Sequence, residues 1–210
     1  MVGSSPILAV FRAEYENFQA NSPDILNGLV VTRLTNAGNI STEGLELDFA
    51  VRPIRGLRLS GGLALTNAQI DQFKQLGTGI LTSDRQGERL PFAPEVKSTF
   101  AVDYDTSPAS LPFDISYSAS VSSTTEQRTA VPDTAAGINP STFLPGFTNV
   151  DASVTFSTKD DRYSLALVGK NLTDSDRPAF IETSGAGNVS RFPRDSDVYY
   201  GVTLRARFGG

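Results

Sequence analysis

The sequence VYYGVTLRARF occupies residues 198–208, and two glycines follow it. Every second position from Val198 to Phe208 is apolar, and mostly polar or small residues lie between them. In a β-strand, side chains alternate between two faces, so this segment has one apolar and one polar face. Its length matches the roughly 9–11 residues with which a tilted strand crosses a bilayer. A final amphipathic strand that ends in phenylalanine is typical of transmembrane β-barrels.

Seven further segments show the same period-two pattern. The clearest is Phe113–Ser122, where apolar residues alternate with an aspartate and four serines. None of the segments has the 3.6-residue period of a helix, so we expect very little helix. In the first segment the alternation predicts an apolar face of Ala9, Phe11, Ala13 and Tyr15. The eight segments are residues 7–20, 29–52, 57–66, 99–104, 113–122, 149–156, 163–170 and 198–208.

The connections between these segments alternate between short and long. Short connections are expected at residues 52–56, 105–112 and 159–161, and long polar loops at 71–93, 125–145 and 172–195. Outer-membrane barrels have short periplasmic turns and long extracellular loops. The pattern therefore predicts an all-β, antiparallel, up-and-down transmembrane β-barrel segment of about eight strands. A soluble β-sandwich also alternates with period two, but these strands exceed the usual five or six residues.

Composition excludes several other classes of protein. The net charge is −5 and no segment is strongly basic, which disfavours a nucleic acid partner. The 210 residues include no cysteine and no histidine. Thiolate metal sites, thiol catalysis and Ser-His catalysis therefore cannot arise within this chain. No segment approaches the ~18 uninterrupted apolar residues of a membrane-spanning helix.

Charged residues on the polar faces are expected to line a wetted barrel lumen. Glu46 and Asp48 could be read as an acid/base pair or a cation site, but alternation alone accounts for such charges. Acidic residues in the predicted turns and loops lack the spacing of a calcium-binding loop; these are Asp84, Asp133, Asp160, Asp161, Asp174 and Asp176. We therefore predict no catalytic, cofactor-binding or metal-binding residues. The expected lumen-facing charges are Arg12, Glu14, Glu16, Glu46, Asp48, Arg58, Asp103, Asp114, Asp151, Lys170, Arg205 and Arg207.

Aromatic residues are expected to form belts at the two membrane interfaces, because their amphipathic rings favour that depth. Tyr163 and Phe208 are placed near the rim with the short turns. The rim with the long loops is expected to carry Phe18, Phe73, Phe92 and Phe147.

Five strings, in order along the chain, resemble the C-terminal part of TonB-dependent receptors. They are TNAG and TEGLEL at 35–38 and 42–47, RPIRGLRLSGGLALTNA at 52–68, GERLPFAP at 87–94, KNLTD at 170–174, and PR with YGVTLRARF at 193–194 and 200–208. Their residues also suit turns, bulges and strand ends. We therefore interpret the strings as architectural rather than ligand-binding.

The resemblance implies that residues 1–210 form the C-terminal part of a receptor barrel in the outer membrane of a Gram-negative bacterium. The plug domain, the N-terminal strands and the segment that contacts TonB would lie outside this chain. The start, MVGSSP, lacks the basic and apolar regions of a signal peptide, which also favours a fragment. The whole receptor would take up a scarce ligand such as a siderophore, captured at the extracellular loops, with energy relayed by TonB.

Two other functions remain open at the level of sequence. Eight strands can close into a small barrel with a filled interior, which would serve as an adhesin or structural anchor. An outer-membrane hydrolase is disfavoured because the chain has no histidine. We therefore expect no enzymatic activity and no cofactor, with outer-membrane lipid as the surrounding partner.

Overall fold

The computed structural model describes residues 6–26, 29–74, 81–82, 86–129, 143–184, 187–193 and 196–208. Every regular element among these residues is a β-strand. In the same part of the chain there is no helix with the length and hydropathy needed to cross a membrane.

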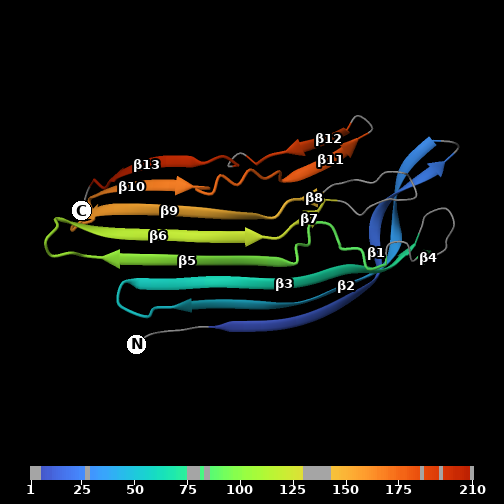
Figure 1. The fold of residues 1–210 in the computed structure, drawn as a ribbon, viewed down its shortest axis with the longest axis horizontal. Coiled ribbons are helices and arrows are strands. Elements are labelled where there is room, and N and C mark those ends of the chain that lie inside the picture. The colour runs from blue at the N-terminus through green and yellow to red at the C-terminus, as the bar shows by residue number, and fades with distance from the viewer. Residues whose placement is uncertain are drawn as a thin grey trace.

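Eight long strands form one sheet in which each strand pairs antiparallel with the next along the chain. The sheet is open, with β1 and β13 at its two edges (Figure 1). This confirms the predicted all-β, up-and-down architecture and all eight predicted strand positions. The strands are β1 (Ile7–Leu26), β2 (Leu29–Val51), β3 (Leu57–Lys74), β5 (Val96–Thr106), β6 (Phe113–Thr124), β9 (Phe147–Thr158), β10 (Tyr163–Lys170) and β13 (Tyr199–Ala206).

The predicted asymmetry of the connections is also present. The turns that join β2 to β3, β5 to β6 and β9 to β10 lie at one end of the sheet, and the connections after β3, β6 and β10 lie at the other (Figure 1). In the first short turn, the amide N–H of Leu57 donates to the carbonyl of Ile54 at 3.2 Å. Gly56 has a φ of 82°, which glycine adopts without steric cost. Gly56 therefore supplies the backbone conformation that this turn requires.

The long connections contain five short strands that the period-two pattern did not reveal. A segment of two to five residues is too short to display alternation, so only its pairing partner identifies it as a strand. These elements are β4 (Leu81–Thr82), β7 (Gln127–Arg128), β8 (Phe143–Leu144), β11 (Phe180–Ser184) and β12 (Gly187–Arg191). β7 pairs with β8, β11 pairs with β12, and β4 pairs with the end of β3.

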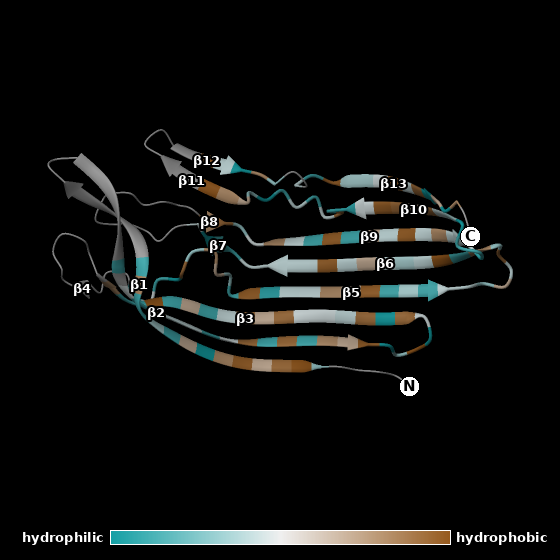
Figure 2. Cartoon of the chain, turned by 180° about the vertical axis from the view of Figure 1, so that it is seen from behind, coloured by the Kyte–Doolittle hydropathy of each residue, from teal (hydrophilic) through white to brown (hydrophobic). Residues whose placement is uncertain are grey.

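The register produces one polar and one apolar face across the whole sheet. One row of paired residues crosses five strands as Asp48, Gly62, Thr99, Ser122 and Asn149. The neighbouring row, one residue along each strand, is Phe49, Gly61, Phe100, Val121 and Val150. Figure 2 shows the same alternation of hydrophilic and hydrophobic residues along the long strands.

The prediction for the first strand is wrong, because it assigned the two faces of β1 in reverse. Val10 pairs with Leu45, so Arg12, two residues further on, has the parity of the apolar face. Phe11 pairs with Gly44 and has the parity of the polar face. From Ile7 to Tyr15 the odd-numbered positions are all apolar, so the alternation favours that face, but the pairing with β2 places it on the polar side.

A small buried cluster at the long-loop end corrects two of the predicted belt residues. Phe73 is buried against Ile70, and Phe18 packs against the same cluster with Ile40 and Leu90. These phenylalanines therefore contribute to a local core rather than to a membrane interface. Large apolar side chains of the apolar face are exposed; Leu204 is 79% exposed and Val202 is 68% exposed. Such a face is energetically reasonable only when apolar material covers it.

Candidate functional site

A ladder of serine hydroxyl groups on β6 forms the centre of the polar face. The Ser116 hydroxyl donates to the Asp105 carboxylate at 2.6 Å. The Ser118 hydroxyl donates to the Asp103 carboxylate at 2.8 Å. The two carboxylates on β5 are thus held by the neighbouring strand, which leaves a wall of small, hydroxylated side chains.

Two lysines neutralise further carboxylates on this face. The ammonium of Lys159 lies 2.6 Å from Asp114, and that of Lys170 lies 2.8 Å from Asp151. The four side chains are between 25% and 52% exposed. Ion pairs that are this accessible to solvent contribute little to stability. They neutralise charge at this part of the polar face.

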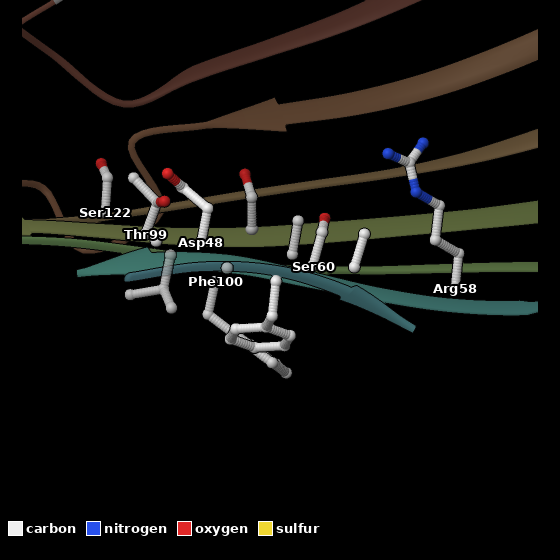
Figure 3. Close-up of a pocket in the computed structure, with 13 residues that line it drawn as sticks. Asp48, Arg58, Ser60, Thr99, Phe100 and Ser122 are labelled. Carbon is white, nitrogen blue, oxygen red and sulfur yellow. The ribbon is translucent and has the colours of Figure 1, made fainter. Parts of the chain in front are cut away.

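The part of the polar face on β2 and β3 is different, because its charges have no side-chain partner among the described residues. Among the described residues, neither Glu46, Asp48 nor Arg58 makes a hydrogen bond or an ion pair with another side chain. A hollow of about 430 Å³ adjoins Asp48 and Arg58. Figure 3 shows its labelled polar side chains rising from one side of the sheet, with Phe100 on the other. These polar side chains are Asp48, Arg58, Ser60, Thr99 and Ser122.

One buried polar atom in the same row also lacks a partner. The side-chain oxygen of Asn149 is buried and receives no hydrogen bond within the described residues. A buried unsatisfied acceptor is costly, at about 1–3 kcal/mol, and usually marks a contact made elsewhere. Within the described residues, the polar face therefore has one buried acceptor without a partner, on β9, and exposed charges without side-chain partners on β2 and β3.

Most of the predicted lumen-facing charges do share the polar face. Arg12 and Glu14 do not, as described above, and Arg12 pairs with Glu14 and Glu43 at 2.7 and 3.5 Å. Glu16 lies where the register shifts between Tyr15 and Phe18. Arg207 follows the last residue of β13. The charges whose register positions confirm the prediction are Glu46, Asp48, Arg58, Asp103, Asp114, Asp151, Lys170 and Arg205.

No metal site is formed by the residues that the structure describes, since no three His, Cys, Asp or Glu side chains cluster there. Asp84 and Asp133, two of the predicted loop acids, lie outside the described residues. In the β9–β10 turn, the Thr158 hydroxyl donates to the Asp160 carboxylate at 2.6 Å, and the Arg162 amide donates to it at 3.2 Å. These hydrogen bonds lower the pKa of Asp160 below 3.8.

Asn171, within the KNLTD string, makes hydrogen bonds that hold the local backbone. Asn171 is buried, with a φ of 49°, and its side-chain amide N–H₂ donates to the carbonyl of Ser196 at 2.6 Å. Its side-chain oxygen accepts from the amide of Ser175 at 3.0 Å. Asn171 therefore fastens both ends of the last long connection to the end of β10. Asparagine suits this position because it tolerates a positive φ and offers both donor and acceptor.

Three other predicted belt residues lie in different environments. Phe147 is not on the apolar face, because it pairs with Thr124 on the polar side and lies under the guanidinium of Arg177 at 3.9 Å. Phe92 lies at the long-loop end and stacks on Phe180, with ring centroids 6.1 Å apart. Tyr163 lies at the short-turn end, where it is 54% exposed.

Comparison with known proteins agrees with this geometry. A family model described as TonB dependent receptor-like, beta-barrel matches residues 8–172. The ferric yersiniabactin uptake receptor FyuA from Yersinia pestis superposes with a TM-score of 0.74 over 98% of this chain, at 17% identity. The ferric-catecholate import receptor Fiu from K12 E. coli gives a TM-score of 0.68 over 98% of this chain, at 22% identity. At such low identity the likeness establishes the fold.

The chain spans 28% of the length of FyuA and 25% of that of Fiu. The family model covers most of the chain, and the sheet has the antiparallel order, the two-faced strands and the one-sided long loops of an outer-membrane barrel. The chain therefore belongs to the family of TonB-dependent receptor β-barrels, which are outer-membrane receptors of Gram-negative bacteria and not enzymes.

Proposed function

We propose that this chain is the C-terminal barrel segment of a receptor that takes up a scarce ligand, such as a siderophore, across the outer membrane with energy relayed by TonB. The observation that carries the proposal is the combination of family and geometry. All long connections gather at one end of a sheet with one polar and one apolar face. In such a barrel the long loops face outside, where the ligand arrives.

The open edges of the sheet support its role as one part of a larger barrel. β1 and β13 each have one side without a pairing strand in this sheet. Unpaired backbone groups cannot be satisfied in hydrocarbon, where each costs several kcal/mol. Further strands that pair with β1 and β13 would remove both edges. This favours the receptor over a self-contained eight-stranded adhesin or anchor, in which β1 and β13 would have to pair with each other.

The unpartnered groups of the polar face support a second domain inside the barrel. A packed apolar interior against Asp48, Arg58 and the side-chain oxygen of Asn149 would bury these polar groups at a cost in free energy. A polar plug domain could supply donors and charges to all three. A siderophore is the ligand class that we favour, because the receptors FyuA and Fiu, which share this fold, have ferric chelates as their ligands.

The test is uptake by the full-length receptor in iron-starved cells. Energy-dependent accumulation of ⁵⁵Fe from at least one of a set of catecholate, hydroxamate and phenolate siderophores is expected, and a protonophore or loss of TonB should abolish it. Accumulation that is unaffected by both treatments, or absent for all three chelate classes, contradicts the proposal.

A matched experiment tests whether residues 1–210 are sufficient for uptake. Residues 1–210, exported with an added signal peptide, should give no energy-dependent uptake of the same chelates. Uptake by this segment alone would show that neither a plug nor further strands are needed, and would refute its role as one part of a larger barrel.

A further inference from the structure

Three long connections meet at one end of the sheet, and their described parts contact one another. We name residues 86–95 loop A, residues 125–129 and 143–146 loop B, and residues 171–184, 187–193 and 196–198 loop C. In Figures 1 and 2 the short strands β7, β8 and β11, which belong to loops B and C, lie close together at this end.

Loop A is joined to loop B by two bonds that both involve Arg128. The amide of Phe92 donates to the carbonyl of Arg128 at 2.8 Å. The guanidinium of Arg128 donates to the carboxylate of Glu88 at 2.7 Å. The side chains of this ion pair are 25% and 35% exposed, so water screens it less than a pair on the open surface.

Loop B is joined to loop C at the next residue. The hydroxyl of Thr129, which is buried, donates to the carbonyl of Ile181 at 2.9 Å. A second contact lies near the base of both loops, where the guanidinium of Arg177 covers the ring of Phe147 on β9. Loop C therefore has a polar and a cation–π contact with the β6–β9 connection and its base.

Loop A also contacts loop C directly, which completes a closed ring of contacts. The rings of Phe92 and Phe180 stack with an interplanar angle of 15°. Every pair among the three loops is thus connected. Arg128 has a central position, because its guanidinium also lies 4.7 Å from the ring of Phe143, which pairs with it across the β7–β8 bridge.

We propose that loops A, B and C move as one body and that Arg128 is the positioning residue that joins them. In a closed ring of contacts each loop is held from two sides, so displacing one loop requires the other two to follow or their contacts to break. A ligand that engages one loop therefore meets three loops already arranged relative to one another, which lowers the entropic cost of binding. The proposal concerns the ligand-free protein, and only its consequence for capture rests on the proposed receptor function.

The test is hydrogen–deuterium exchange of the ligand-free full-length receptor in detergent. Arg128→Met keeps an unbranched side chain but removes the contacts to Glu88 and the cation–π contact to Phe143. The informative segment is 179–182 of loop C, which the Arg128 side chain does not contact in any described interaction. Exchange there should rise about fivefold, the factor expected when one interaction of typical strength is lost, together with exchange at 88–92.

Two further variants complete the design. Arg128→Lys retains a cation near Glu88, so it should restore most of the protection in all three loops. Arg162→Gln, in the β9–β10 turn at the opposite end, should leave all three unchanged. A rise confined to loops A and B in Arg128→Met, or no rescue by Arg128→Lys, overturns the proposal. Because no ligand is used, a failed uptake assay would leave this result intact.

Discussion

The ring of Phe11 on β1 occupies the space that a side chain on Gly44 of β2 would need. An added Cβ at Gly44 would lie 2.7 Å from the Phe11 Cζ atom and would also meet the carbonyl oxygen of Leu65 on β3. The aromatic ring and the glycine are thus matched across the β1–β2 pair. This contact accounts for an aromatic residue on the polar face, where the alternation did not place it.

Gly44→Ala should therefore destabilise the barrel by about 1–3 kcal/mol, the usual range for overpacking. The measurement is urea-dependent unfolding of the full-length receptor in detergent. Because the Leu65 carbonyl is fixed by the sheet, the added Phe11→Ala substitution should recover only part of the loss. A Gly44→Ala protein as stable as the parent would show that β1 and β2 separate easily.

Leu204→Arg and Thr203→Arg should have opposite outcomes, although the two residues are adjacent. Leu204 pairs with Leu165 on the apolar face, and Thr203 pairs with Ala166 on the polar face. An arginine on the lipid side near the midplane costs on the order of 2–4 kcal/mol, whereas lumen positions tolerate charge. Folding into lipid vesicles measures both. Equal losses, or a larger loss for Thr203→Arg, would mean that the polar face is turned toward lipid.

Asn171 offers a way to separate backbone conformation from hydrogen bonding. Asn171→Gly tolerates the positive φ but loses the side-chain bonds to Ser175 and Ser196, whereas Asn171→Ala loses the bonds and also strains the backbone. Removing the bonds should cost about 1–3 kcal/mol, and alanine should cost more than glycine. The rate of proteolysis of loop C at equal protease concentration shows which of the two variants is more destabilised. Equal proteolysis of Asn171→Ala and Asn171→Gly would show that the positive φ does not explain why asparagine occupies this position.

The β9–β10 turn should contribute stability that depends on pH. Hydrogen bonds lower the pKa of Asp160 in the folded protein below 3.8, so its stabilising effect is present above that value and is lost as pH falls through the lowered pKa. The stability difference between the parent and Asp160→Asn should thus be constant at neutral pH and shrink in acid. Unfolding curves collected from pH 7 to pH 2 test this. A stability difference that grows in acid would mean that folding raises the pKa of Asp160 instead of lowering it.

The sequence predicts the fold well wherever a strand is long and its two parities differ in chemistry. Phe113–Ser122 is such a segment, and its faces are as expected. Prediction failed in β1, where the apolar residues at odd positions from Ile7 to Tyr15 suggest one face and the pairing of Val10 with Leu45 assigns the other. A pairing across strands is not encoded in the periodicity of either strand alone.

The loop contacts could not be anticipated for a different reason. Arg128, Phe92 and Phe180 are far apart in sequence, and each has an unremarkable neighbourhood. Their contacts depend on how three connections fold over the end of the sheet. A position near a loop predicts an interfacial belt for such aromatic residues, but Phe73 joins a buried cluster and Phe92 stacks within the loops.

The reversed face of β1 also fixes how deeply the chain sits in the membrane. The outward row Val10, Leu45 and Leu65 is apolar, and the next outward row is Arg12, Glu43 and Asn67. Two residues of strand cover roughly 6.6 Å, so the boundary between hydrocarbon and headgroups lies within that step. From Leu65 down to Leu57, β3 extends roughly 26 Å, which at a tilt of about 40° spans roughly 20 Å of the ~25 Å apolar band of these barrels. On β1, β2 and β3, the outward-facing Arg12, Glu43 and Asn67 thus mark the level at which the hydrocarbon ends.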